Sequence, residues 1–211
     1  MGILLSDLKI FKNNDLFDSN SYVLKLNEQT YIIIDPVSSE SNFDLIEYIT
    51  GLPINSKLVI FLTHEHFDHF FGIHKLLESF SSRIFLSENI LKGLNDSRIN
   101  LSYYHNMEYK CDILNFEEIS FSNGLFFLEE FQLSVLFTPG HSTGSQCIFV
   151  KDYLFGGDTI IDPKMTTAKL PGGNKTYLKN TISHLKNTIK INYKVCPGRG
   201  EMFNFSDWQI N

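Results

Sequence analysis

The chain has 211 residues, of which 43% are hydrophobic and 20% are charged. This composition provides enough apolar side chains for a substantial core and too few charges for a disordered chain, and the length favours one domain spanning residues 1–211. Its 24 acidic and 18 basic residues give a net charge of −6, which provides no electrostatic footprint for nucleic acid or an anionic membrane.

The cysteines and the N-terminus indicate a cellular setting. Cys111, Cys147 and Cys196 lie far apart without a CxxC motif, so we expect reduced thiols rather than a disulfide framework. Residues 1–11 lack the basic lead and the apolar run of a signal peptide, and no segment approaches the roughly 20 apolar residues of a membrane span. We therefore expect a cytoplasmic protein without membrane or nucleic-acid partners, and its oligomeric state stays open.

Short apolar runs bounded by turn residues predict strands along both halves of the chain. The first two form a hairpin around Asn27 and Glu28, and the third is continuously apolar, as a buried strand should be. The predicted strands are, in chain order, residues 21–26, 29–34, 58–62, 132–137, 146–150, 153–155 and 193–196.

Helices are predicted between these strands. Ser41 and Asp44 resemble a capping box before a short amphipathic helix, and a second helix is expected over residues 70–80. Residues 87–115 are predicted to form one helix with loops. Asn174 is a suitable N-cap for a later helix with an apolar face. Strand-rich halves that each end in helices predict an α+β sandwich of layered sheets.

A dense group of histidines carries the chemistry. Residues 64–69 read His-Glu-His-Phe-Asp-His directly after the predicted strand 58–62. In an extended segment, positions i and i+2 project to the same side, so His64 and His66 can bind one metal ion. Asp68 and His69 can then face a second position as the chain turns. Neutral imidazoles suit Zn²⁺ or Fe²⁺.

Two more polar side chains follow predicted strands. His141 lies in Thr-Pro-Gly-His-Ser after residues 132–137, and Asp158 lies in Gly-Gly-Asp-Thr after residues 153–155. Either alone is ordinary turn chemistry. Together with residues 64–69 they form a group of histidines and aspartates at strand ends.

With these motifs the chain resembles the metallo-β-lactamase superfamily, and most closely its short glyoxalase-II-like hydrolases. The resemblance covers nearly the whole chain in the right order. Further segments that carry it are Ile34-Asp35-Pro36, Asn95-Asp96, Asn100-Leu101-Ser102, Leu170-Pro171-Gly172-Gly173 and Pro197-Gly198-Arg199-Gly200-Glu201. The resemblance implies an αββα sandwich with metals at one edge between the sheets.

The resemblance also implies a role for each site residue. The first metal would be held by His64, His66 and His141. Asp158 would bridge two metals, and Asp68 and His69 would bind the second. The family usually completes that second site with a histidine, and here Arg199 stands at the matching position.

Arginine stays protonated and has no lone pair for a metal. With hydroxide and two aspartates, two metals give a charge of roughly +1, one metal plus Arg199 gives roughly zero, and two metals plus Arg199 give roughly +2. We therefore expect one tightly bound Zn²⁺, or Fe²⁺, and a second site that is weak or absent, provided that Arg199 points inward. The alternative is that Arg199 faces outward and binds a substrate carboxylate or phosphate.

Several weaker candidates stay open. His74 is expected to be a surface or core residue, and Lys169 to be solvated rather than a contact for an anionic substrate. Asp35 is either a support for the site or ordinary turn chemistry. Residues 103–105 are either a substrate-facing loop or a buried aromatic cluster.

The leading functional hypothesis is a metal-dependent hydrolase of a thioester or ester of a small metabolite or a carrier- or CoA-bound acyl group. A metal-activated hydroxide would attack, oriented by Asp68. The alternatives are a mononuclear Fe²⁺ enzyme resembling persulfide dioxygenases, which would use His64, His141 and Asp158, and a non-catalytic metal-binding module.

Overall fold

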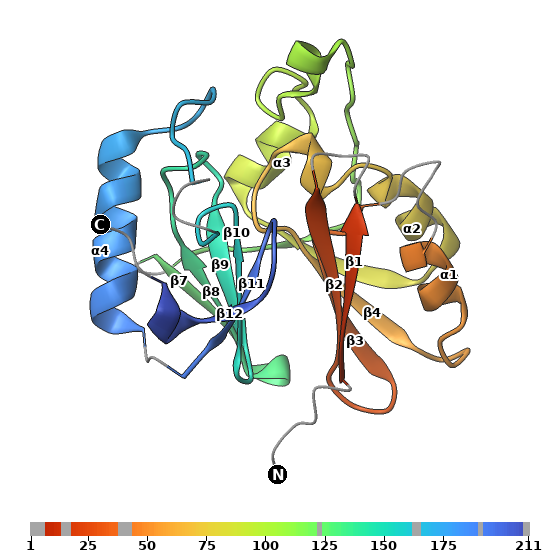
Figure 1. Cartoon of the computed structure of the whole chain (residues 1–211). Coiled ribbons are helices and arrows are strands. Elements are labelled where there is room, and N and C mark those ends of the chain that lie inside the picture. Colours follow the sequence, from red (N-terminus) through yellow and green to blue (C-terminus); the bar gives the residue numbers. More distant parts are fainter. Residues whose placement is uncertain are drawn as a thin grey trace.

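Two six-stranded sheets pack face to face with helices on their outer sides (Figure 1). The computed structural model describes residues 7–13, 18–37, 44–121, 124–161, 166–189 and 192–208. The first half of the chain forms one sheet and the second half forms the other. None of the helices in these ranges has the length and apolar character needed to cross a bilayer.

The first sheet has the strand order β1-β2-β3-β4-β5-β6. Its strands are β1 Leu8–Asn13, β2 Ser19–Lys25, β3 Thr30–Ile34, β4 Lys57–Phe61, β5 Ser82–Leu86 and β6 Glu117–Glu118. Strands β1 to β3 are antiparallel, whereas β3 to β6 are parallel. Helices pack against the outer face of this sheet, namely α1 Asp44–Thr50, α2 Ile73–Ser79 and α3 Glu88–Leu94.

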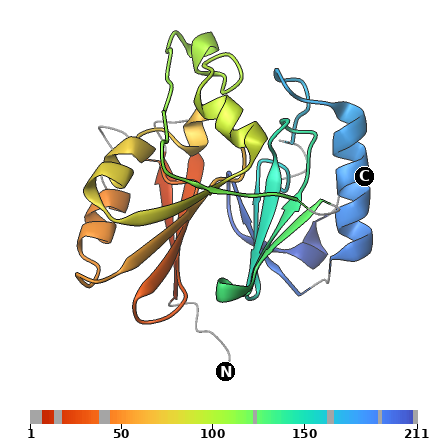
Figure 2. The same cartoon turned by 180° about the vertical axis from the view of Figure 1, so that it is seen from behind.

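The second sheet has the order β12-β11-β10-β9-β8-β7. Its strands are β7 Leu125–Leu128, β8 Leu133–Phe137, β9 Gln146–Val150, β10 Tyr153–Gly157, β11 Lys194–Pro197 and β12 Phe203–Asn204. Among the strands described for this sheet, only β10 and β11 pair in parallel. The 14-residue helix α4 Lys175–Thr188 covers the outer face (Figure 2).

Alternating side chains explain why the first sheet is buried on both faces. In β3, Tyr31 and Ile33 pack toward the helices, and Ile32 and Ile34 pack between the two sheets. This two-residue period follows from strand geometry. Each face therefore meets a separate apolar core, and the sheet is fixed rigidly enough to position the residues that follow its strands.

The structure confirms most of the predicted elements. Strands β2 and β3 form the expected hairpin, and the Asn174 side chain accepts hydrogen bonds from the backbone N–H of Thr176 and of Tyr177. The helix predicted over residues 70–80 begins only at Ile73, because Gly72 adopts a left-handed conformation with φ 80°. Strands β1, β5, β6, β7 and β12 have no counterpart among the predicted strands, and Ser41 lies outside the described residues.

Candidate metal centre

Three buried imidazoles converge where the two sheets meet. His64 and His66 follow β4, and His141 lies in the turn between β8 and β9. One ring nitrogen from each histidine lies within 4.8 Å of those of the other two. The sequence separation between the first two and the third shows that the fold, and not the motif alone, assembles this group.

Hydrogen bonds at Nδ1 of two rings determine which ring nitrogen carries the lone pair. The carbonyl of Thr167 can only accept, so His141 donates to it from Nδ1 at 3.0 Å. His64 Nδ1 lies 3.0 Å from the Thr63 hydroxyl. The Thr63 hydroxyl donates its proton to Asp35 Oδ2, so it accepts a hydrogen bond from His64 Nδ1. Nε2 of both rings therefore carries a lone pair, and that of His141 lies 3.2 Å from His66 Nδ1. Metal-binding histidines are commonly oriented by such bonds at the other ring nitrogen.

Burial and unpaired atoms agree with this arrangement. Within the described residues, Nε2 of His64 and Nε2 of His66 are buried without a hydrogen-bond partner, as is Oδ1 of Asp158. Burial, together with neighbouring histidines, lowers the pKa of His64 and of His66 well below the usual value, so both rings are neutral near pH 7. Neutral imidazoles beside a carboxylate are a donor set that fits a divalent cation.

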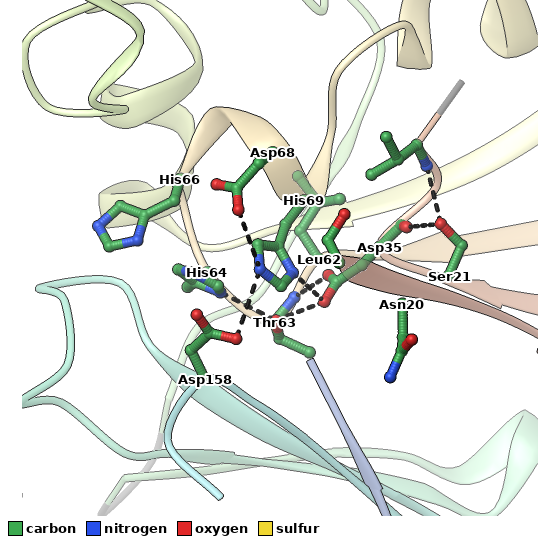
Figure 3. A network of polar contacts seen from close by, with 12 residues as sticks. Asn20, Ser21, Asp35, Leu62, Thr63, His64, His66, Asp68, His69 and Asp158 are labelled. Atoms are coloured by element: carbon green, nitrogen blue, oxygen red, sulfur yellow. Dashed lines mark hydrogen bonds and ion pairs between the residues drawn. The ribbon is translucent and has the colours of Figure 1, made fainter. Parts of the chain in front are cut away.

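Asp35 supports the histidines from behind (Figure 3). Its carboxylate accepts hydrogen bonds from Thr63 N and Thr63 Oγ1, both at 2.6 Å, and from His69 Nδ1 at 3.0 Å. Its backbone has φ 49°, a left-handed conformation that aspartate tolerates better than most residues. Of the two predicted roles, the structure favours the support of the site over ordinary turn chemistry.

A second group of charges lies beside the imidazoles. Asp68 is in a short 3-10 helix over residues 67–69, Asp158 follows β10, and Arg199 follows β11. Arg199 Nε donates to Asp158 Oδ2 at 2.9 Å, and its Nη2 forms an ion pair with Asp68 Oδ2. Arg199 thus points inward, with its side chain 16% exposed.

His69 lies between the same carboxylates. Its Nε2 is 3.5 Å from Asp158 Oδ1 and 3.8 Å from Asp68 Oδ2 (Figure 3). Burial raises the pKa of Asp158, but the charges of His69 and Arg199 outweigh it and hold that pKa at about 2. Burial also opposes the charge of His69, whereas Asp158, Asp68 and Asp35 raise its pKa above the usual value. The cluster is therefore a compact set of paired charges.

Glu65 is a functional candidate that the sequence analysis missed. It lies between His64 and His66 and is 1% exposed. Its carboxylate accepts hydrogen bonds from Ser142 Oγ at 2.7 Å, Thr143 Oγ1 at 2.8 Å and Gly144 N at 3.1 Å. It therefore ties the segment after β4 to the turn that carries His141. Its partners lie 77–79 residues away, so no local pattern could reveal this role.

A cavity of about 450 Å³ opens onto the centre. Its lining residues are Asp18, His66, Phe67, Asp68, Leu101, His105, Asp158, Leu170 and Arg199. His105 therefore faces this cavity, while Tyr103 and Tyr104 are exposed and form no buried aromatic cluster. His74 is exposed beside the Tyr109 hydroxyl, and Lys169 is exposed outside the lining. Neither His74 nor Lys169 is therefore part of the metal centre.

Comparisons with known proteins identify the family. The family model described as the metallo-β-lactamase superfamily matches residues 14–188. The chain belongs to the metallo-β-lactamase superfamily. It is 31% identical to a probable metallo-hydrolase of Streptococcus pyogenes serotype M6, over 92% of this chain and 84% of that one. A probable metallo-hydrolase of Bacillus subtilis is 29% identical over 86% of this chain and 85% of its own length.

Solved structures agree with the fold of this superfamily member. BLEG-1, a B3 metallo-β-lactamase, superposes with a TM-score of 0.82 at 24% identity, covering 94% of both chains. TTHA1623, solved in a di-iron-bound form, has a TM-score of 0.72 at 22% identity, covering 94% of this chain and 95% of that one. The expected αββα sandwich is therefore confirmed, whereas the assignment of each residue as a ligand stays a prediction. The structure gathers all the predicted site residues, namely His64, His66, Asp68, His69, His141, Asp158 and Arg199.

Proposed function

We propose that this protein is a metal-dependent hydrolase of a thioester or carboxylic ester, acting on a small metabolite or a carrier- or CoA-bound acyl group. The observation that carries the proposal is the meeting of three buried imidazoles with two carboxylates beside an open cavity, whose wall includes His66, Asp68 and Asp158. The curated relatives, described as probable metallo-hydrolases, support the same reaction class.

His64, His66 and His141 would hold the metal, with Asp158 Oδ1 available as a further ligand. When bound, a divalent metal supplies Lewis acidity and lowers the pKa of a coordinated water to about 7. Zn²⁺ and Fe²⁺ both suit this donor set, and the di-iron form of TTHA1623 supports testing iron beside zinc.

Asp68 would orient the attacking water. Arg199 pairs with its Oδ2, and no described residue donates a hydrogen bond to its Oδ1. Oδ1 of Asp68 is therefore able to accept a hydrogen bond from a water molecule in the cavity. The guanidinium also fixes the plane of the carboxylate, because Arg199 bonds Asp158 at the same time.

The cavity walls and the leaving group favour a thioester. Phe67, Leu101 and Leu170 give the cavity apolar surface that can pack against an acyl chain. A thiolate leaves without strong assistance from an acid, since a thiol has a pKa of about 8.5. This suits a centre whose nearby arginine holds its proton too tightly to donate it.

The test is metal analysis of the purified protein, followed by a panel of acyl thioesters, carboxylic esters and lactones. We expect turnover of at least one thioester or ester that depends on added Zn²⁺ or Fe²⁺ and disappears in His66→Ala. His74→Ala is the matched control, because this exposed histidine contacts Tyr109 instead. If the wild-type protein hydrolysed every substrate no faster than His66→Ala does, the proposal would be rejected and a non-catalytic metal-binding module favoured. Oxygen consumption with a thiol persulfide, without hydrolysis, would favour the dioxygenase alternative.

A further inference from the structure

Arg199 lies in a position built for a cation. Two carboxylates and an imidazole surround its guanidinium: Asp158 at 2.9 Å from Nε, Asp68 paired with Nη2, and His69 Nε2 at 3.5 Å from Nη2. The side chains of Asp68, His69 and Asp158 are at most 7% exposed. Two carboxylates this close and this buried need a positive partner, since each would otherwise carry an uncompensated charge.

Hydrogen bonds hold the loop at residues before and after Arg199. Asn20 donates from its side chain to the carbonyl oxygens of Pro197, at 3.1 Å, and Gly200, at 2.9 Å. The backbone N–H of Asn20 donates to Gly198 O at 2.8 Å, and the Tyr22 hydroxyl donates to Pro197 O at 2.7 Å. These bonds come from the first sheet, so the loop is fixed between the two halves of the chain.

The backbone at Gly198 packs closely against the carboxylate of Asp158 and the ring of His69. A Cβ atom on Gly198 would lie 2.3 Å from Asp158 Oδ1 and 2.8 Å from His69 Cε1. Only glycine therefore allows the backbone to come this close to the carboxylates. The anchored backbone and the two ion pairs leave the guanidinium little freedom to leave its position.

We propose that Arg199 is a resident cation that occupies the position of a second metal, so that the protein binds one metal, at His64, His66 and His141. A guanidinium has no lone pair and remains charged at every physiological pH, so it neutralises the carboxylates without being a ligand. With a hydroxide, Asp68 and Asp158 carry about −3, which Arg199 and one divalent metal balance with about +3. A second metal would raise the positive charge to about +5 in the same confined volume.

The inference deepens the proposed function by fixing the number of metals, but it is tested by metal content alone. Metal-free protein is titrated with Co²⁺ at stoichiometric supply, and bound metal is counted by elemental analysis and by the Co²⁺ absorption spectrum. The proteins compared are the wild type, Arg199→His and Arg199→Gln. Arg83→Gln is the matched control, because Arg83 also pairs with two carboxylates, Glu117 and Glu130, at a distant and partly exposed site.

We expect one Co²⁺ per chain for the wild type and for Arg83→Gln. Either variant at position 199 should take up a second equivalent, because Asp68, His69 and Asp158 lose their resident cation. The second ion should bind more tightly in Arg199→His, where an added imidazole raises the possible ligands from three to four. Arg199→Gln provides the same test if Arg199→His fails to fold.

Two results would overturn the inference: two tightly bound Co²⁺ per wild-type chain, or one per chain in both variants at position 199. These results are distinct from a failure of the proposed function. One metal per wild-type chain without hydrolysis of any ester or thioester would reject the hydrolase and leave Arg199 as the resident cation. Two metals per wild-type chain together with hydrolysis of an ester or thioester would support the hydrolase and reject Arg199 as the resident cation.

Discussion

The buried carboxylate of Glu65 offers a direct test of how the centre is held together. In Glu65→Gln the side chain keeps its size but loses its charge and one acceptor oxygen. The wild-type carboxylate accepts from three donors, Ser142 Oγ, Thr143 Oγ1 and Gly144 N. Hydrogen bonds to a charged group stabilise a protein by about 1.5–3 kcal/mol each, and those between neutral groups by about 0.5–1.5 kcal/mol.

The expected cost follows from these three bonds. Each loses about 1 kcal/mol with the charge, and part of that loss is offset because the buried charge no longer has to be desolvated. Ser142 Oγ can turn to donate to Ser145 Oγ, 2.8 Å away, and accept from the new amide. We therefore expect Glu65→Gln to lower the free energy of unfolding by about 2 kcal/mol, which for a chain of this length lowers Tm by about 4–8 °C.

The assay is thermal unfolding of metal-free protein, followed by metal titration. Because the Ser142–Gly144 turn directly follows His141, we also expect a loss of about 10-fold or more in metal affinity. Glu88→Gln is the control, since Glu88 is exposed and pairs with Lys92 one turn along α3, and it should change neither Tm nor affinity. A Tm for Glu65→Gln equal to that of the control would refute the idea that this carboxylate ties the two segments together.

Three further predictions concern the metal, the aspartate and the thiols. His66→Ala should lose the metal on dialysis, because two imidazoles remain of three; full retention of metal would contradict its role as a ligand. Asp68→Asn should retain most of the metal but lower kcat about 10²- to 10⁴-fold, and an unchanged kcat on the identified substrate would exclude Asp68 from orienting the water. Burial raises the pKa of Cys147 to about 12 and of Cys111 to about 11, and that of Cys196 as well. Since only the thiolate reacts, all three should resist a disulfide reagent at pH 8 and react in denaturant, and one fast thiol in the native protein would show that this burial is wrong.

The sequence predicts the parts of the site that are local. His64, His66, Asp68 and His69 follow one strand, so the spacing alone brings them to one place. It also predicts helix α4, because Asn174 caps it with bonds to residues two and three positions away. Both are short-range effects that a linear pattern records.

The rest depends on contacts between distant residues. Glu65 occupies a spacer position of the motif, and only the docked turn after His141 shows what its carboxylate holds. In the sequence Asn20 is an ordinary strand residue, because its hydrogen-bond partner Pro197 lies 177 residues further along the chain. The expectation of one tightly bound metal depends on Arg199 pointing inward, and only the folded structure shows this direction. Such pairings arise from the packing of the two sheets, which no short segment encodes.

The division of the chain into two sheets gives the centre one more property. Two of the three imidazoles, His64 and His66, follow a strand of the first sheet, and His141 belongs to the second. A chain cut between β6 and β7 would leave each fragment with an incomplete set of ligands. Metal would then bind strongly only to the reassembled pair, and its concentration would control how much of the split protein comes together.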